Sequence, residues 1–161
     1  MKLLCLFFFV ISTAFTPDLA EVRKDFKLAT NDRESALALR DKLKTVSKED
    51  NTILVAYKGA VTALTAKYTK DNAERKDLFK NGILLLEHAV AQKPENIEIR
   101  CLRLSIQENS PKFLKYRSNI GEDKIFILNN YQKTGSQVVK DFVKAYVLQS
   151  TEFNTEEKQR F

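Results

Sequence analysis

The fold of this chain is decided by two neighbouring stretches, ILVAYKGAVTALTAKY at residues 53–68 and NAERKDLFKNGILLLEHAVAQ at residues 72–92. In both, apolar side chains recur every three or four residues, the spacing of one face of an α-helix. Asp50 or Asn51 suits the N-cap of the first helix, which we expect to run to about Lys67. Because only a short polar loop separates the two stretches, they predict two long helices folded back as a helical hairpin.

Each of these two helices carries a stripe of small side chains. Gly59, Ala63 and Ala66 form the stripe on the first helix, and Gly82 and Ala89 form that on the second. A glycine inside a helix costs about 1 kcal/mol relative to alanine, so it needs a packing reason. We therefore expect the two stripes to face each other and the two backbones to approach closely.

Helical spacing recurs along the rest of the chain. Upstream, two short amphipathic helices are expected on either side of residues 30–32. Downstream, helices are expected over residues 97–107, just after Pro111, from about residue 120 to Tyr131, and over residues 137–148. The charged tail from about residue 152 is expected to fray or to form a last turn. The chain is thus predicted to be a single all-α domain over residues 15–161, with six or seven helices arranged as stacked antiparallel hairpins.

Composition agrees with this prediction. The chain has 161 residues, of which 43% are apolar and 30% charged, which excludes collagen-like, disordered and polytopic membrane proteins. Its four glycines and three prolines are too few for a turn-rich sheet protein, which favours long helices.

The N-terminus has the pattern of a secretory signal. Lys2 precedes the apolar run LLCLFFFVI at residues 3–11, and small residues follow at Ser12, Thr13 and Ala14. The run is too short to span about 30 Å of hydrocarbon as a helix, so cleavage after Ala14 is favoured over a retained anchor. Residues 1–14 are therefore predicted to be a signal peptide. The remainder is expected to be exported, soluble, and periplasmic or extracellular.

Removal of this signal changes the cysteine count and the charge. Cys5 leaves with it, so Cys101 is the remaining cysteine and no intramolecular disulfide is expected. Cys101 lies among apolar residues and is expected to be a small buried side chain. The loss of Lys2 lowers the formal net charge from +6 to +5, which favours encounters with anionic partners but does not specify one.

Few side chains in this sequence could support catalysis. His88 is the single histidine, which excludes a zinc site with two histidines, and the sequence contains no HExxH, GxSxG, phosphate-loop or dinucleotide motif. We therefore predict no catalytic residue, no metal and no cofactor. The alternative is a small hydrolase-like enzyme built around Glu87, His88, Arg100 and Arg103.

The segment from residue 97 to residue 107 is expected to be a helix that is apolar on two sides. Between those sides runs a polar stripe formed by Arg100, Arg103 and Gln107, which is the best candidate binding surface. Two guanidinium groups can grip a carboxylate or a phosphate, and Gln107 can pair with a backbone amide. In the competing interpretation, the arginines pair within the chain with Glu87 or Glu108.

The densest basic stretch includes Lys112, Lys115 and Arg117, with Phe113 and Tyr116 between them. Its pattern is similar to a nucleic-acid patch, but an exported protein seldom meets nucleic acid, so no nucleic-acid partner is expected. The same three cations form a solvated face or, as another alternative, a weak contact with an anionic membrane surface.

One segment resembles a known family. Gly82, Leu86, Ala89 and Pro94 match the small, large, small, proline spacing of the second helix of a tetratricopeptide repeat, and residues 94–96 are similar to its inter-repeat turn. The likeness covers about Gly82 to Ile106, and no second copy is present. The whole chain also resembles small uncharacterised exported proteins of Gram-negative bacteria, above all over residues 97–116. The tetratricopeptide resemblance implies a non-catalytic binding or scaffold module in the cell envelope, with a protein or peptide as its partner.

Overall fold

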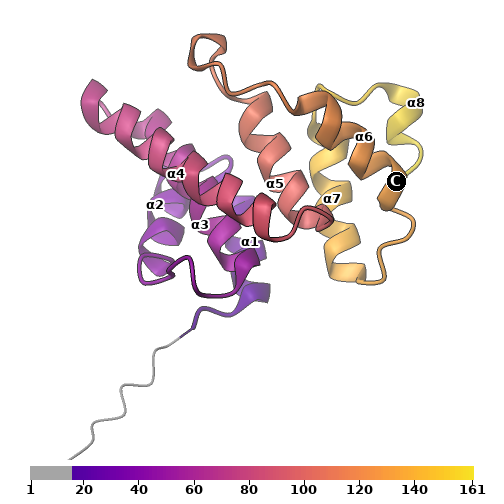
Figure 1. Cartoon of the computed structure of the whole chain (residues 1–161), viewed down its shortest axis with the longest axis horizontal. Coiled ribbons are helices and arrows are strands. Elements are labelled where there is room, and N and C mark those ends of the chain that lie inside the picture. Colours follow the sequence, from indigo (N-terminus) through magenta and orange to yellow (C-terminus); the bar gives the residue numbers. More distant parts are fainter. Residues whose placement is uncertain (1–15) are drawn as a thin grey trace, which may run out of the picture.

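The computed structural model describes residues 16–161, and all regular secondary structure in that range is helical (Figure 1). The predicted all-α class is therefore confirmed. The helices are α1 (Leu19–Ala29), α2 (Arg33–Lys42), α3 (Thr52–Thr65), α4 (Asn72–Gln92), α5 (Ile97–Glu108), α6 (Ile120–Asn130), α7 (Gln137–Gln149) and α8 (Thr155–Lys158), with 3₁₀ turns η1 (Ala66–Tyr68) and η2 (Lys112–Leu114). The predicted signal peptide lies outside the described residues.

The described range contains eight α-helices, against the six or seven expected. The short helix expected just after Pro111 is the 3₁₀ turn η2, and the tail, expected to fray or to form a last turn, contains the additional α-helix α8. It is held by a capping box in which the Asn154 side chain accepts from the Glu157 N–H and the Glu157 carboxylate accepts from the Asn154 N–H. The Phe161 ring packs 4.4 Å from that of Tyr131 and 6.0 Å from that of Phe153, so the last residue is anchored against the domain.

Seven of the eight helices begin at a residue whose side chain accepts a hydrogen bond from a backbone N–H of the first turn. Of the two N-cap candidates for α3, Asn51 is the one used. The helix starts are therefore encoded locally by short polar side chains. These residues are Asp18, Asp32, Asn51, Asp71, Asn96, Ser136 and Asn154.

Helices α3 and α4 pack along each other through the two predicted stripes. A Cβ atom on Gly59 would lie 2.7 Å from the Leu86 nitrogen and 2.8 Å from the Gly82 oxygen, and one on Gly82 would collide with the Ala63 backbone. Gly59 thus meets Leu86 while Ala63 meets Gly82, which is an antiparallel arrangement. The packing reason expected for both glycines is confirmed.

Helix α5 lies between two hydrophobic cores (Figure 1). Ile99, Leu102 and Ile106 face the first core, which contains α1 to α4. On its other side, α5 contributes residues to a second core with α6, α7 and Phe153. Cys101 belongs to this second set and is free and buried, as expected. The prediction of a helix with two apolar sides is confirmed, and it explains how one helix joins the two halves of the domain.

Within residues 16–161, no helix combines the length and the apolar character that crossing a membrane requires.

Candidate functional site

The predicted arginine stripe of α5 is covered by α6 and neutralised there. Asp123 of α6 is wholly buried and accepts from Arg103 Nε at 2.7 Å, from Arg103 Nη2 at 2.6 Å and from Arg100 Nη1 at 2.9 Å. Both guanidinium groups are themselves buried. The structure therefore brings the two arginines together around one acidic residue of the same chain.

Three further groups complete this arginine cluster. Arg103 Nη1 donates to Glu87 at 3.1 Å, which is one of the intramolecular pairings considered from the sequence. Arg100 Nε donates to the Pro94 carbonyl at 2.8 Å, and its Nη1 also pairs with Glu122. Burial alone would lower the pKa of Arg103, but its hydrogen bonds with Asp123 and the nearby negative charges raise it. The cluster is a charge-compensated link between α4, α5 and α6.

Gln107, the third residue of the stripe, is wholly buried. Neither its amide nitrogen nor its amide oxygen has a hydrogen-bond partner in the part of the chain that the structure describes. A partner-binding role for Arg100, Arg103 and Gln107 stays a prediction. Because all three side chains are buried, other parts of the surface are more accessible to a partner.

The predicted basic patch is divided by the fold. Arg117 Nη1 donates to the carbonyls of Gln107 and Glu108, and its Nη2 pairs with Glu152 at 3.1 Å, so its guanidinium is occupied within the chain. Lys112 and Lys115, in contrast, are exposed. Neither ammonium group forms a hydrogen bond or an ion pair with another residue of the range 16–161 that the structure describes.

Only some of the residues proposed for the hydrolase-like alternative are in contact. Glu87 meets Arg103 and also accepts from the Tyr116 hydroxyl. His88 is half-buried and forms no hydrogen bond with Glu87 or either arginine. Among the described residues, no group of three or more histidine, cysteine, aspartate or glutamate side chains is placed to hold a metal ion.

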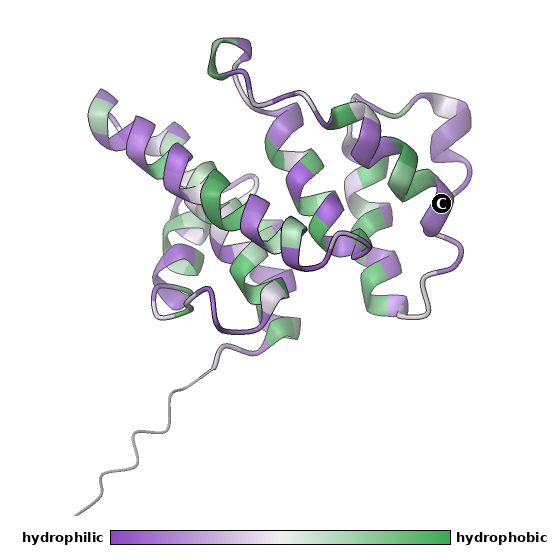
Figure 2. Ribbon diagram, in the orientation of Figure 1, coloured by the Kyte–Doolittle hydropathy of each residue, from purple (hydrophilic) through white to green (hydrophobic). Residues whose placement is uncertain are grey.

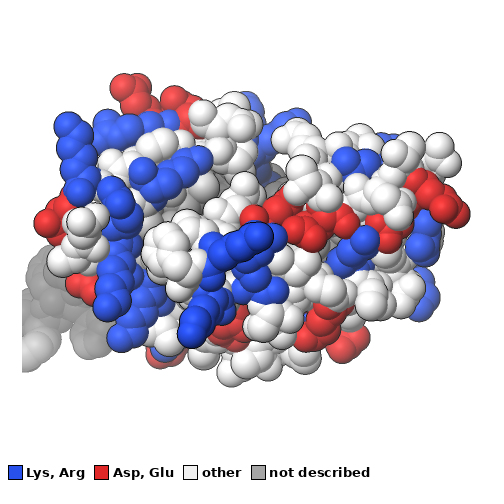
Figure 3. Space-filling view, turned by 90° about the horizontal axis from the view of Figure 1, so that it is seen from above, with Lys and Arg blue, Asp and Glu red and all other residues white. Residues whose placement is uncertain are grey.

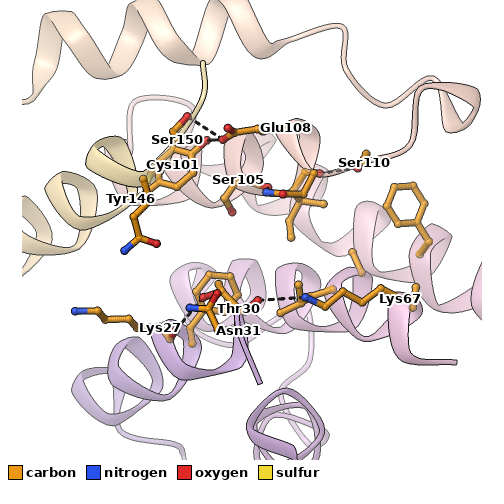
Figure 4. Close-up of a pocket in the computed structure, with 18 of the residues that line it drawn as sticks. Lys27, Thr30, Asn31, Lys67, Cys101, Ser105, Glu108, Ser110, Tyr146 and Ser150 are labelled. Atoms are coloured by element: carbon orange, nitrogen blue, oxygen red, sulfur yellow. Dashed lines mark hydrogen bonds between the residues drawn. The ribbon is translucent and has the colours of Figure 1, made fainter. Parts of the chain in front are cut away.

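A cleft of about 1470 Å³ lies between α1 and α7. One face of α1 lines one side, through residues such as Ala20, Lys24 and Lys27, and one face of α7 lines the other. Figure 4 shows Lys27, Thr30, Asn31 and Lys67 on one side of the space, with Cys101, Ser105, Glu108 and Tyr146 across from them. The end of α3, the start of α4 and the loop after α5 complete the lining.

Three aromatic rings bring α1, α3 and α7 together beside the cleft. Phe26 and Tyr57 have ring centroids 5.3 Å apart, and Phe142 lies 5.8 Å from Tyr57. The Tyr57 hydroxyl donates to buried Glu98 at 2.7 Å, and Arg23 donates to both oxygens of that carboxylate at 2.7 and 2.8 Å. Burial and the Glu98 charge raise the pKa of Tyr57. This buried group fixes α1, α3 and α5 relative to one another.

Glu108 joins α5 to the end of α7 on the other side of the cleft. Its carboxylate accepts from the Tyr146 hydroxyl at 2.6 Å, the Ser150 hydroxyl at 2.8 Å and the Thr151 N–H at 2.6 Å. Burial alone would raise the pKa of Glu108, but these hydrogen bonds outweigh it and lower the pKa below its ordinary value. Nearby Cys101 has its pKa raised by burial, which disfavours a reactive thiolate.

The lining of the cleft is predominantly basic at its polar positions. Three of its cations are engaged with the protein, since Arg23 is bound to Glu98, Arg75 donates to the Thr69 carbonyl and Lys67 donates to the Thr30 carbonyl. The ammonium groups of Lys24, Lys27 and Lys76 form no hydrogen bond or ion pair with other described residues. The lining contains six cations and two acids. The acids are Glu108 and Asp141, and the cations are Arg23, Lys24, Lys27, Lys67, Arg75 and Lys76.

A pattern in the sequence of α7 corresponds to this cleft, although it was not predicted to form a binding surface. Val138, Phe142 and Ala145 follow one another at spacings of four and three, and Val139, Val143 and Val147 form a second such series on the same helix. The second series packs into the core. The first series lines the cleft. The spacing alone does not tell which of the two faces packs into the core, because that depends on tertiary packing.

No family model, no curated protein and no solved structure matches this chain.

Proposed function

We propose that this chain is an exported, non-catalytic binding module that holds a segment of a protein or peptide partner in the cleft between α1 and α7. The volume of the cleft, about 1470 Å³, supports this proposal. Small-molecule sites usually have volumes of about 300–1,000 Å³, so this one has room for a length of polypeptide.

The single observation that carries the proposal is the second apolar face of α7. Val138, at 54% exposure, half-buried Phe142 and Ala145 line the cleft, whereas Val143 and Val147 are buried in the core. A helix that is apolar on two sides is stable when both sides are covered. Because the described chain covers only the core side fully, the cleft side is suited to a partner that lies in a groove.

The finer architecture belongs to the same proposal. The close pair of α3 and α4, followed by the turn at residues 94–96 and then α5, supports a tetratricopeptide-like stacking of helical hairpins. Such stacks form concave surfaces that bind peptides. The signal-like N-terminus is the basis for proposing that the module works in the periplasm or outside the cell.

A peptide selection tests this proposal. A library of random 14-residue peptides is selected against the immobilised full-length protein, and the enriched peptides are then measured against Ala145→Trp, which places a bulky ring on the α7 wall of the cleft. We expect enriched peptides to lose at least about tenfold in affinity, or about 1.4 kcal/mol, on Ala145→Trp. Ala38→Trp, at an exposed position of α2 outside the cleft, is the matched control and should leave binding unchanged.

Circular dichroism of both variants serves to check that they keep their helices. If no peptide is enriched, or if the enriched peptides bind Ala145→Trp as well as the wild type, the proposed function is wrong.

A second candidate function, contact with an anionic lipid surface, is favoured by one observation. Phe113 is 80% exposed between Lys112 and Lys115, and Figure 2 shows an apolar stretch on the protruding loop between α5 and α6. A lysine near an anionic membrane contributes about 1 kcal/mol, and an inserted ring adds apolar burial. This candidate omits Arg117, which is bound within the chain.

Sedimentation with phosphatidylglycerol vesicles at low salt tests the lipid candidate. Binding that is lost in both Phe113→Ser and the Lys112→Ala plus Lys115→Ala variant would support it. Absence of binding by the wild type would eliminate it.

A further inference from the structure

The lining of the cleft is unbalanced in charge. It carries six cations and two acids, and one of the cations, Arg23, is already paired with Glu98. The five remaining cations outnumber the two acids, and a neutral or basic partner would leave this excess uncompensated. Figure 3 shows Lys and Arg side chains gathered over the half of the molecule that contains α4, with acidic side chains concentrated toward α6. Negative charge on the occupant is therefore favoured.

The free cations lie beside the apolar wall. Lys24 and Lys27 are exposed residues three positions apart on α1, so they extend from one face of that helix. Across the cleft, Ala145 and the part of Phe142 that its contacts with Phe26 and Tyr57 leave open form an apolar surface on α7. An occupant that matches both features has an apolar face that packs against α7. It also has carboxylates one helical turn apart that pair with Lys24 and Lys27 of α1.

The length of the apolar wall indicates what kind of segment covers it. The apolar positions of α7 in the lining run from Val138 to Ala145 and span about 10 Å at a rise of about 1.5 Å per residue. A helical segment of about two turns would cover this length, whereas a small anion would leave most of it uncovered. Exposed Phe113 at the end of the lining extends the apolar surface beyond the helices.

We infer that the cleft binds an acidic amphipathic helix of a partner protein, its apolar face against Phe142 and Ala145 and its carboxylates toward Lys24 and Lys27. This inference rests on the proposed function and specifies the partner. Binding of this kind places the apolar residues of the partner at i, i+3, i+4 and i+7.

Three synthetic 14-residue peptides test the inference by fluorescence anisotropy with the full-length protein. The first has leucines on one helical face and glutamates on the other, the second replaces every glutamate with lysine, and the third scrambles the first. We expect the acidic amphipathic peptide to bind at least about tenfold more tightly than either of the others, with an affinity that falls as salt is added.

Charge reversal on α1 provides the matched variant. Lys24→Glu plus Lys27→Glu should weaken the acidic peptide at least about tenfold and improve binding of its lysine counterpart. Lys48→Glu plus Lys133→Glu changes the net charge equally at exposed positions outside the lining and should alter the affinity by less than about threefold.

The outcomes separate this inference from the proposed function. If the random selection yields neutral or basic peptides that depend on an open cleft, the inference is wrong and the proposed function stands. If the scrambled acidic peptide binds equally well, charge alone is recognised and the amphipathic helix is rejected. If a 16-carbon fatty acid binds with sensitivity to Ala145→Trp and the acidic peptide does not bind, the occupant is a small amphiphile and the inference is overturned.

Discussion

Arg103 holds Asp123 through two adjacent hydrogen bonds, from Nε to Oδ2 at 2.7 Å and from Nη2 to Oδ1 at 2.6 Å. Both residues are buried, and Arg100 adds a third donor to the same carboxylate. The paired geometry fixes the position of α6 against α5. This relationship makes Asp123, a residue without any distinctive pattern in the sequence, central to the second half of the domain.

Asp123→Asn should destabilise the protein strongly, because it removes the buried charge shared by both guanidinium groups and leaves them only the partly exposed Glu87 and Glu122. We expect a loss of about 3–5 kcal/mol in the free energy of unfolding, measured by urea denaturation. Glu122→Gln, at a side chain that is 54% exposed, should cost less than about 1 kcal/mol. Equal effects of the two substitutions would contradict the structural role given to Asp123.

Gly82→Ala should separate α3 from α4, since the added Cβ would collide with backbone atoms that cannot rotate away. Overpacking of this kind costs about 1–3 kcal/mol or more, and we expect at least that loss in thermal unfolding. Gly121→Ala in α6 is the control because nothing lies within 4 Å of its added Cβ. There alanine should stabilise the helix by up to about 1 kcal/mol. A neutral Gly82→Ala would show that the helices are not in close contact.

Gln107→Met should stabilise the protein. It replaces two buried amide atoms that lack partners among the described residues with an apolar group of similar size. An unsatisfied buried polar group costs about 1–3 kcal/mol, so a gain of about 1 kcal/mol is expected in urea denaturation. The same change at exposed Gln92 provides the comparison. A net loss in Gln107→Met would mean that the amide is satisfied in solution.

Glu108 should make the stability of the protein depend on pH in the acid range. Its pKa is lowered in the folded state from an ordinary value of 4.5, so its contribution is fully present above that pH and is lost as the pH falls through the folded value. The difference in stability between wild type and Glu108→Gln should therefore shrink below pH 4.5 in denaturation at a series of pH values. Glu95→Gln, at an exposed side chain, is the control. A difference that stays constant down to pH 2 would refute this role.

Several elements of this fold could be predicted because their causes are local. The N-cap at Asn51, the contact between the Gly59 and Gly82 stripes and the two apolar sides of α5 depend on spacings within one or two helices. The polar stripe of α5 was also located correctly along the chain. Its burial could not be foreseen, because Asp123 lies 20 residues beyond Arg103 and nothing in the intervening sequence indicates that they pair.

The amino-acid sequence by itself determined that this chain forms helices, where most of them begin and which of their faces are apolar, since these properties follow from side-chain spacing and from caps only a few residues away. The tertiary structure alone decided which apolar faces are covered. Helix α7 has two such faces, and only the packing of α5, α6 and the aromatic group around Tyr57 leaves that of Phe142 and Ala145 facing the cleft. The physical reason is that burial depends on the sum of contacts between distant segments, which no single segment specifies.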